Sequence, residues 1–246
     1  MIAADDRPAL TQIIVAVPVR NEAKRLPQLL RALAASAIRS PLGVTVVLLA
    51  NNCTDHSSEI VRSFVHPSLR LELHEIEFAD AHAGIARRKA MDLATRAGAL
   101  ILTTDGDAAP DPHWIAAALS AAHSGADVVC GRIDADCRHV LATSTGRRVT
   151  AAEAAYANLQ HELRHAIDVL TARQGAQQPH YIESGASLAI RADCYQAIGG
   201  LPWVRSSEDR ALVHRAEVQC HRRSDGAAGS PTAALYRVRS LPGDPR

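Results

Sequence analysis

The chain has 246 residues, of which 47% are hydrophobic and 22% charged, and its formal net charge is +1. These values are typical of one sizeable globular domain with a substantial core. The small net charge and the aromatic content of 3% argue against a nucleic-acid partner. Proteins that bind nucleic acids usually carry basic patches or aromatic stacking platforms.

Cysteine usage and the N-terminus bear on the compartment. The five cysteines are widely spaced and form no Cys-x-x-Cys pair, which argues against a disulfide framework or a zinc knuckle. Residues 1–10 carry Asp5 and Asp6 in place of an apolar segment, so no signal peptide is expected. No apolar run approaches the roughly 20 residues that cross a bilayer. We therefore expect a cytoplasmic protein without a transmembrane segment, and peripheral contact with a membrane stays open.

The first half of the chain alternates strands with helices. Apolar runs predict strands at 13–17, 44–50, 100–104 and 128–133, and alternation of apolar and polar residues predicts a half-buried strand at 69–76. Apolar residues at helical spacing predict helices at 22–37, 55–65, 81–97 and 112–123. This alternation implies an α/β fold, in which helices cover both faces of a mostly parallel sheet.

The second half is less regular. We expect a long helix at 150–173, a strand at 181–190 and a short helix at 193–198 that Gly199 and Gly200 end. Residues 221–246 are rich in Arg, Pro, Gly and Ser and predict a poorly ordered tail after a main domain of residues 1–220.

An acidic pair follows the strand predicted at 100–104. Asp105 and Asp107 flank Gly106, and a turn there can aim both carboxylates at one point. Two carboxylates at one point hold a divalent cation or share a proton. The strand-end position favours the cation, because ligands of open α/β sheets bind there. The alternative is a polar turn that caps the next helix.

Four further polar segments accompany the acidic pair. They are Pro18–Glu22 after the first strand, Ala50–Asp55 after the second, Gly84 with Arg87 and Arg88 on the third helix, and Gly199–Pro202 with Ser207–Leu212. In this order and at these distances, the five elements resemble the family 2 glycosyltransferases of the GT-A fold, from Ile13 to Leu212.

The resemblance implies a nucleotide-sugar half at about 12–135 and an acceptor half at about 136–220. Residues that would bind the donor are Pro18, Arg20, Asn21, Glu22, Asn51, Arg87 and Asp105. Asn51 stands where the family commonly has an aspartate for the base, and Arg87 would meet the diphosphate. Asp107 would bind Mn²⁺ or Mg²⁺, and Asp105 would contact the metal or the ribose. Asp209, beside Glu208, would be the general base.

The implied activity is a metal-dependent, inverting transfer of a sugar from a nucleoside diphosphate, with UDP favoured, to a hydroxyl acceptor. After Leu212 the resemblance implies a further helix, a strand and often a histidine that completes the metal shell. The chain instead continues with His214, Cys220 and His221 before the tail. We therefore expect a C-terminus that is truncated or scrambled relative to relatives, and a non-catalytic protein that only binds nucleotide sugars is the alternative.

Two other functions are alternatives for this sequence. His161-Glu162-Leu163-Arg164-His165 is an HExxH sequence on a helix, which places both histidines on one face for zinc with Glu162 as base. A metalloprotease also needs a third ligand, for which Glu183 is the obvious candidate. A sugar nucleotidyltransferase shares a similar sheet, but its Gly-rich loop after the first strand does not match Val17-Pro18-Val19-Arg20.

Overall fold

The computed structural model describes residues 8–170, 183–204, 206–223 and 237–240. Its centre is a six-stranded sheet in the order β3-β2-β1-β4-β8-β6. The strands are β1 (Gln12–Val19), β2 (Val44–Asn51), β3 (Arg70–Ile76), β4 (Ala99–Thr103), β6 (Val128–Cys130) and β8 (Leu188–Arg191). β1 to β4 are mutually parallel, whereas β8 runs antiparallel to both β4 and β6. The mostly parallel α/β sheet is confirmed.

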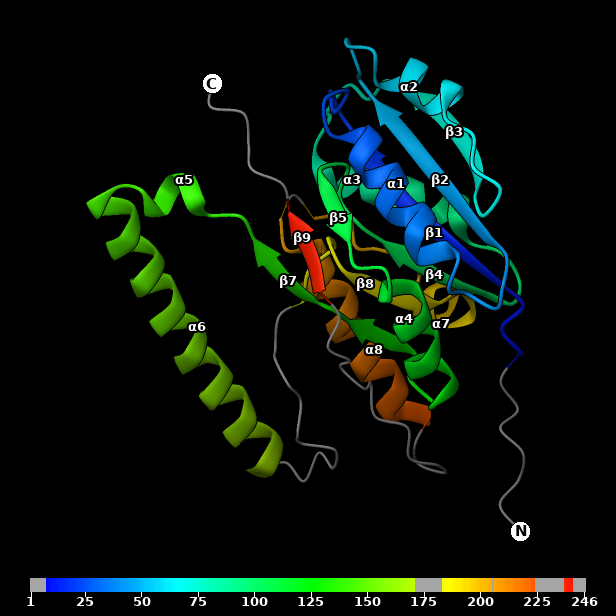
Figure 1. The fold of residues 1–246 in the computed structure, drawn as a ribbon. Helices are drawn as coiled ribbons and strands as arrows, with labels where there is room; N and C mark the ends of the chain where they lie inside the picture. The colour runs from blue at the N-terminus through cyan, green and yellow to red at the C-terminus, as the bar shows by residue number, and fades with distance from the viewer. Residues whose placement is uncertain (1–7, 171–182, 205, 224–236, 241–246) are drawn as a thin grey trace.

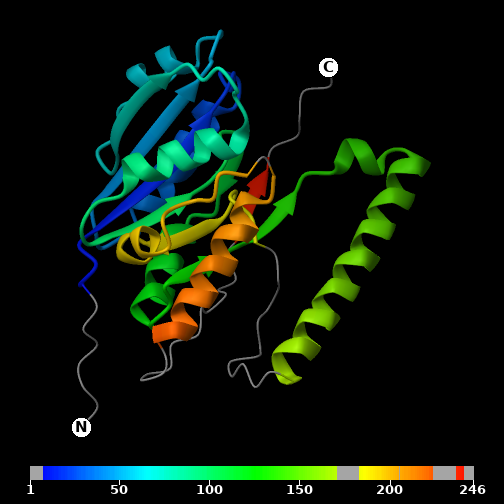
Figure 2. The same ribbon diagram turned by 180° about the vertical axis from the view of Figure 1, so that it is seen from behind.

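Helices cover both faces of this sheet (Figures 1 and 2). Successive residues of a strand point to opposite faces, and the two core clusters divide β1 accordingly. Ile13, Val15 and Val17 pack in one cluster with α1 (Leu26–Ala37) and α4 (Trp114–His123). Ile14 and Ala16 pack in the other with α3 (Ala83–Ala94), α7 (Ala192–Ala197) and α8 (Glu208–Arg223). α2 (Ser57–Ser63) lies beside β3. Burial on both faces explains why the central residues of β1 and β2 are almost all apolar.

A second, small sheet has the order β5-β9-β7, with β5 at Ala108–Pro110, β9 at Arg237–Ser240 and β7 at Arg132–Ala135. After β7 the chain forms α5 (Arg138–Leu141) and then α6 (Ser144–Leu170). Both views show α6 standing apart from the body of the molecule (Figures 1 and 2). Within the described ranges, no helix combines the length and the hydropathy needed to cross a bilayer.

Several boundaries differ from the sequence expectation. α6 begins at Ser144, six residues before the predicted start at Thr150, and residues 171–173 of the predicted helix lie outside the described part. The strand predicted at 181–190 is wrong in extent, because residues 183–187 form a turn and β8 begins at Leu188. Residues 181 and 182 lie outside the described part.

Parts of the region expected as an irregular tail have regular structure. Residues 221–223 continue α8, and β9 pairs with β5 and β7. Such short strands depend on pairing with distant segments, which a local pattern does not contain. Residues 224–236 and 241–246 of the expected tail lie outside the described part.

Candidate active site at the carboxyl edge of the sheet

A cavity of about 430 Å³ lies where β1, β2 and β4 end and α3 begins. Its volume is in the range of small-molecule sites. The lining residues are Pro18, Arg20, Glu22, Asn51, His82, Ala83, Ala86, Arg87, Asp105, Gly106 and Asp107. Of the residues predicted to bind donor or metal, all but Asn21 line this cavity. The order of the parallel strands therefore brings together side chains that are far apart in the sequence.

The acidic pair is fixed by its neighbours on both sides. Thr104 donates its backbone N–H to the carbonyl of Ala16 at 3.4 Å and its hydroxyl to the carbonyl of Ala186 at 2.9 Å. Gly106 passes so close to β1 that an added Cβ would lie 3.3 Å from the carbonyl oxygen of Pro18 and 3.1 Å from Cγ of Glu22. A side chain at position 106 would crowd both. The turn therefore aims Asp105 and Asp107 into the cavity.

Arg87 is the central cation of the site. Its side chain is 7% exposed and forms an ion pair with Asp105. Its Nη1 lies 3.4 Å from Oε1 of Glu208, whose side chain is 10% exposed. The guanidinium thus joins the acidic pair, on the donor side, to the first turn of α8. Its buried Nε has no hydrogen-bond partner among the described residues, which leaves one donor unsatisfied.

Asp209 lies on α8 beside Glu208 and does not line the cavity. Its Oδ2 accepts the backbone N–H of Gly185 at 2.9 Å, and its Oδ1 accepts the N–H of Arg210 at 2.8 Å. Ser207, just before α8, has a positive φ of 59°. Non-glycine residues in that region store strain and are frequent at functional sites.

The turn at 183–187 contacts two of the predicted site residues, Arg87 and Asp209, and was not predicted from the sequence. Gly185 packs directly against the Arg87 guanidinium, so an added Cβ would collide with it. The neighbouring Ser187 accepts the indole N–H of the buried Trp114 at 3.1 Å. The turn therefore holds both Arg87 and Asp209. The signal that could have found it is the interruption of an apolar run by Glu183, Ser184 and Gly185.

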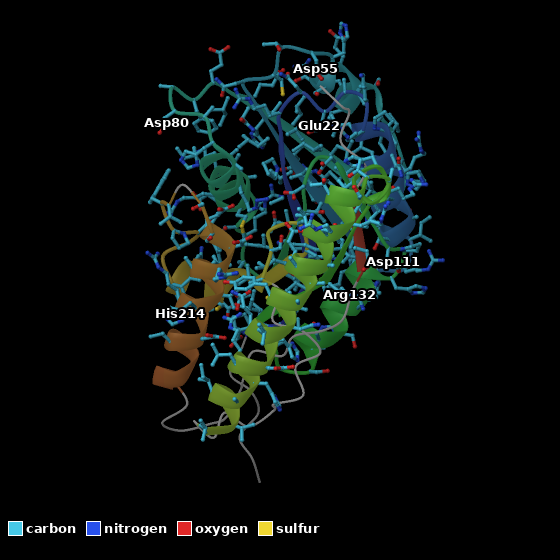
Figure 3. The ribbon with its side chains drawn as sticks, turned by 90° about the vertical axis from the view of Figure 1, so that its left-hand side faces the viewer. Glu22, Asp55, Asp80, Asp111, Arg132 and His214 are labelled. Atoms are coloured by element: carbon cyan, nitrogen blue, oxygen red, sulfur yellow. The ribbon has the colours of Figure 1, made fainter. Side chains whose placement is uncertain are left out.

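The turn after β1 is fixed by residues that follow β2. The N–H of Glu22 donates to the hydroxyl of Ser57 at 2.9 Å, and the N–H of Ala23 donates to Oδ2 of Asp55 at 3.0 Å. Figure 3 shows Glu22 and Asp55 at the same end of the molecule. Asn21, with a φ of 55°, accepts the N–H of Thr54 at 2.8 Å. The structure thus places Asn21 in this turn and Glu22 at the cavity.

Asn51, Arg20 and His82 also line the cavity. Asn51 is buried and donates its side-chain amide to the carbonyl of Val19 at 3.0 Å. Arg20 donates to the carbonyl of Ala81 at 3.3 Å. His82 was not predicted from the sequence; its Nδ1 accepts the N–H of Ile85 at 3.3 Å and caps α3. Histidine is an unusual N-cap, so the residue type did not indicate this role.

The charges of the cavity favour a bound cation. Three carboxylates line it, and two of them have ion-pair partners, Glu22 with Arg25 at 3.0 Å and Asp105 with Arg87. Within the described residues, Asp107 has no such partner. Burial, and then the charge of Asp105, raise the pKa of Asp107 above its ordinary value. A divalent ion would offset both effects, so these oxygen ligands fit Mn²⁺ or Mg²⁺.

No side chain in the described ranges extends this pair to a group of three or more His, Cys, Asp or Glu that could hold a metal. Mg²⁺ commonly keeps several waters and shares substrate phosphates, so two carboxylates are compatible with it. Figure 3 shows His214 on α8, well below Glu22. Its Nδ1 lies 3.8 Å from Glu217. Cys220 and His221 are not described at the side-chain level.

The HExxH sequence does not form a zinc site with Glu183. Oε1 of Glu183 lies 2.8 Å from Arg164 of α6, and Oε2 lies 3.4 Å from Arg210 of α8. The Glu183 carboxylate thus forms ion pairs with two guanidinium groups. Within the described ranges, no group of three or more His, Cys, Asp or Glu that could hold a metal is present.

The family model for Glycosyl transferase family 2 matches residues 14–188, which is more than half of the chain. The chain belongs to this family. Its matched part contains the whole cavity lining, and α8 with Glu208 and Asp209 follows it. No curated protein matches the sequence.

Solved structures of similar fold include S. aureus TarS 1–349, with a TM-score of 0.62 and 16% identity over 94% of this chain and 60% of that one. The mannosyltransferase PcManGT from Pyrobaculum calidifontis, in complex with GDP-Man and Mn²⁺, has a TM-score of 0.60 and 18% identity over 94% and 59% of the two chains. Glucosyl-3-phosphoglycerate synthase from Mycobacterium tuberculosis, in complex with UDP, has a TM-score of 0.54 and 13% identity over 96% and 73%. The alignments thus cover about three fifths of the first two structures. They confirm the GT-A fold.

Proposed function

We propose that the chain is a metal-dependent, inverting glycosyltransferase that moves a sugar from a nucleoside diphosphate to a hydroxyl acceptor. The observation that carries the proposal is the cavity in which Asp105, Asp107 and Arg87 converge, in a chain of this family. UDP is the favoured nucleotide, although the similar structures include complexes with both UDP-GlcNAc and GDP-Man.

We assign the base, the ribose and the diphosphate of the donor to residues that line the cavity. Pro18, Arg20, Asn51 and His82 would contact the base and ribose, whereas Arg87 and the acidic pair would contact the diphosphate. Asn51 offers an amide, which can donate to or accept from a pyrimidine edge. One N–H of its amide already donates to the carbonyl of Val19, which leaves the side-chain carbonyl oxygen as an acceptor and the second N–H as a donor. Asp107, with Asp105, would hold the metal ion.

In the reaction, the acceptor oxygen forms a bond to the anomeric carbon while the bond from that carbon to the diphosphate oxygen breaks. Asp209 takes the proton of the acceptor hydroxyl, and one direct displacement inverts the anomeric configuration. When bound, Mn²⁺ or Mg²⁺ would offset the charge that develops on the leaving nucleoside diphosphate. Arg87 adds a buried positive charge on the same side. Gly185 orients Asp209 through its backbone N–H.

The proposal is tested by release of nucleoside diphosphate from UDP-GlcNAc, UDP-glucose and GDP-mannose with Mn²⁺. Asp209→Asn should lower the rate about 10²–10⁴-fold, which is the usual contribution of a general base, and leave donor binding unchanged. Asp111→Asn is the matched control, because this residue lies outside the cavity and accepts the N–H of His113 through an oxygen that asparagine retains.

Three outcomes separate the alternatives. Loss of turnover in Asp209→Asn alone supports the proposed enzyme. Donor binding without turnover in the unmodified protein, across these donors, favours the non-catalytic nucleotide-sugar-binding protein. Absence of both binding and turnover contradicts the proposal.

A further inference from the structure

α6 carries an apolar face that the rest of the described chain leaves uncovered. Tyr156, Leu159 and Leu163 have exposed fractions of 62%, 64% and 62%, Val149 of 48% and Leu170 of 84%. α6 stands apart from the body in both views (Figures 1 and 2). Large exposed apolar patches usually mark interaction sites. We call these five residues, with Ala152 and Ala166 between them, the α6 stripe.

The spacing of the α6 stripe is that of a two-stranded coiled coil. Val149, Tyr156, Leu163 and Leu170 recur every seven residues, and Ala152, Leu159 and Ala166 lie three residues after the first three of them. These are the a and d positions of three heptads. A membrane-surface helix would carry mainly Lys and Arg on its polar face. The polar positions of α6 instead hold both signs of charge, which favours a protein helix as the partner.

The charges beside the stripe identify the partner helix as a second copy of α6. Arg148 precedes an a position and Glu153 follows a d position, so they occupy g and e positions five residues apart. In a parallel pair, g of one helix meets e of the next heptad on the other. Arg148 of each copy would then face Glu153 of the other. Both side chains are exposed, and neither has an ion-pair partner among the described residues. An antiparallel pair centred on the stripe would separate them.

We propose that this chain forms a two-fold symmetric dimer through parallel pairing of the α6 stripes. Arg164, which reaches Glu183 on the body, lies about 100° around the helix from Leu163. The dimer contact therefore leaves the Arg164–Glu183–Arg210 ion pairs intact. These pairs lie next to Asp209, so the dimer would also fix α6 relative to the site.

The mass of the full chain in solution, measured by sedimentation equilibrium, tests the dimer. Leu163→Asp should abolish it, and circular dichroism should show that the fold is retained, because this side chain is exposed. Ala154→Glu, at the f position on the opposite side of α6, should leave the dimer unchanged.

Charge variants test the parallel register. Arg148→Glu places Glu opposite Glu, and Glu153→Arg places Arg opposite Arg. The dissociation constant of the dimer should therefore rise about tenfold in each variant alone. A mixture of the two variants restores both ion pairs and should form heterodimers as stable as the original dimer. A monomeric chain at all concentrations overturns the proposal, and so does a dimer that is insensitive to these substitutions. Nucleotide binding does not depend on the dimer, so either result leaves the proposed activity separately testable.

Discussion

The Nη1 atom of Arg87 lies 3.4 Å from Oε1 of Glu208, and the two side chains are 7% and 10% exposed. This contact links α3, which borders the donor cavity, to α8, which carries the proposed base. The same guanidinium pairs with Asp105. Arg87 thus connects the cavity to the helix that carries the proposed base, and its substitution should affect both stability and binding.

Removal of Arg87 should be strongly destabilising. In Arg87→Met the Glu208 carboxylate stays buried without its cation, which typically costs about 3–5 kcal/mol. Glu208→Gln removes only one of the two partners of Arg87 and should cost less. The loss of unfolding free energy in the double variant should be smaller than the sum of the two single losses by at least about 1 kcal/mol. Urea denaturation of the four proteins measures this coupling, and strictly additive effects would show that the pair does not interact in solution.

Gly185→Ala should displace Arg87. The new Cβ would collide with the guanidinium, which cannot move without losing its contact with Asp105 or Glu208. We expect a loss of about 1–3 kcal/mol, as is typical of overpacking, together with weaker nucleotide binding. Gly43→Ala is the control, because an added Cβ there meets nothing within 4 Å. Equal stability of the two variants would contradict the close contact between Gly185 and Arg87.

Asp107 should oppose folding when it is ionised and no metal is bound. Its pKa in the folded protein is raised above the ordinary value of 3.8 by burial and then by Asp105. A carboxyl group whose pKa is raised on folding stabilises the folded protein fully below its ordinary pKa. This stabilisation is lost as the pH rises through the pKa of the group in the folded protein. Asp107→Asn cannot ionise. Without metal at pH 7 it should melt about 1–2 °C higher than the unmodified protein, since solvent screens the half-buried group.

The advantage of Asp107→Asn should vanish at acidic pH, below the ordinary pKa of 3.8. Thermal unfolding of both proteins across this range, followed by circular dichroism, provides the check. A variant that melts below the unmodified protein at pH 7 without metal would show that the Asp107 charge contributes to stability.

The sequence predicted the strands of the parallel sheet well because their signals are local. β1, β2 and β4 are continuous apolar runs, and burial on both faces of a parallel sheet requires such runs. Once these strands are placed, topology alone brings Asn51 to the same edge as Asp105 and Asp107. The family model confirms the predicted family, and the observed sheet confirms the predicted fold.

What the sequence could not supply depends on contacts between distant segments. Arg87 and Glu208 are 121 positions apart, and each was predicted for a separate role without the ion pair that joins them. From the sequence alone, the turn at 183–187 is predicted as part of the strand that continues into β8. Its contacts with Arg87 and Asp209, which are far away in the sequence, show that it is a turn. β5 and β9 are too short for any periodicity and form by pairing with distant segments, β5 with β9 and β9 also with β7.

Binding of UDP to the unmodified protein, measured by titration calorimetry with Mn²⁺ and with EDTA, tests the central claim most directly. We expect Mn²⁺ to tighten binding by at least about tenfold, which corresponds to about 1.4 kcal/mol. Asp107→Asn should lose this effect, and Asp111→Asn should retain it. UDP binding of the same strength in all three proteins, with or without Mn²⁺, would contradict a metal-assisted nucleotide site in this cavity.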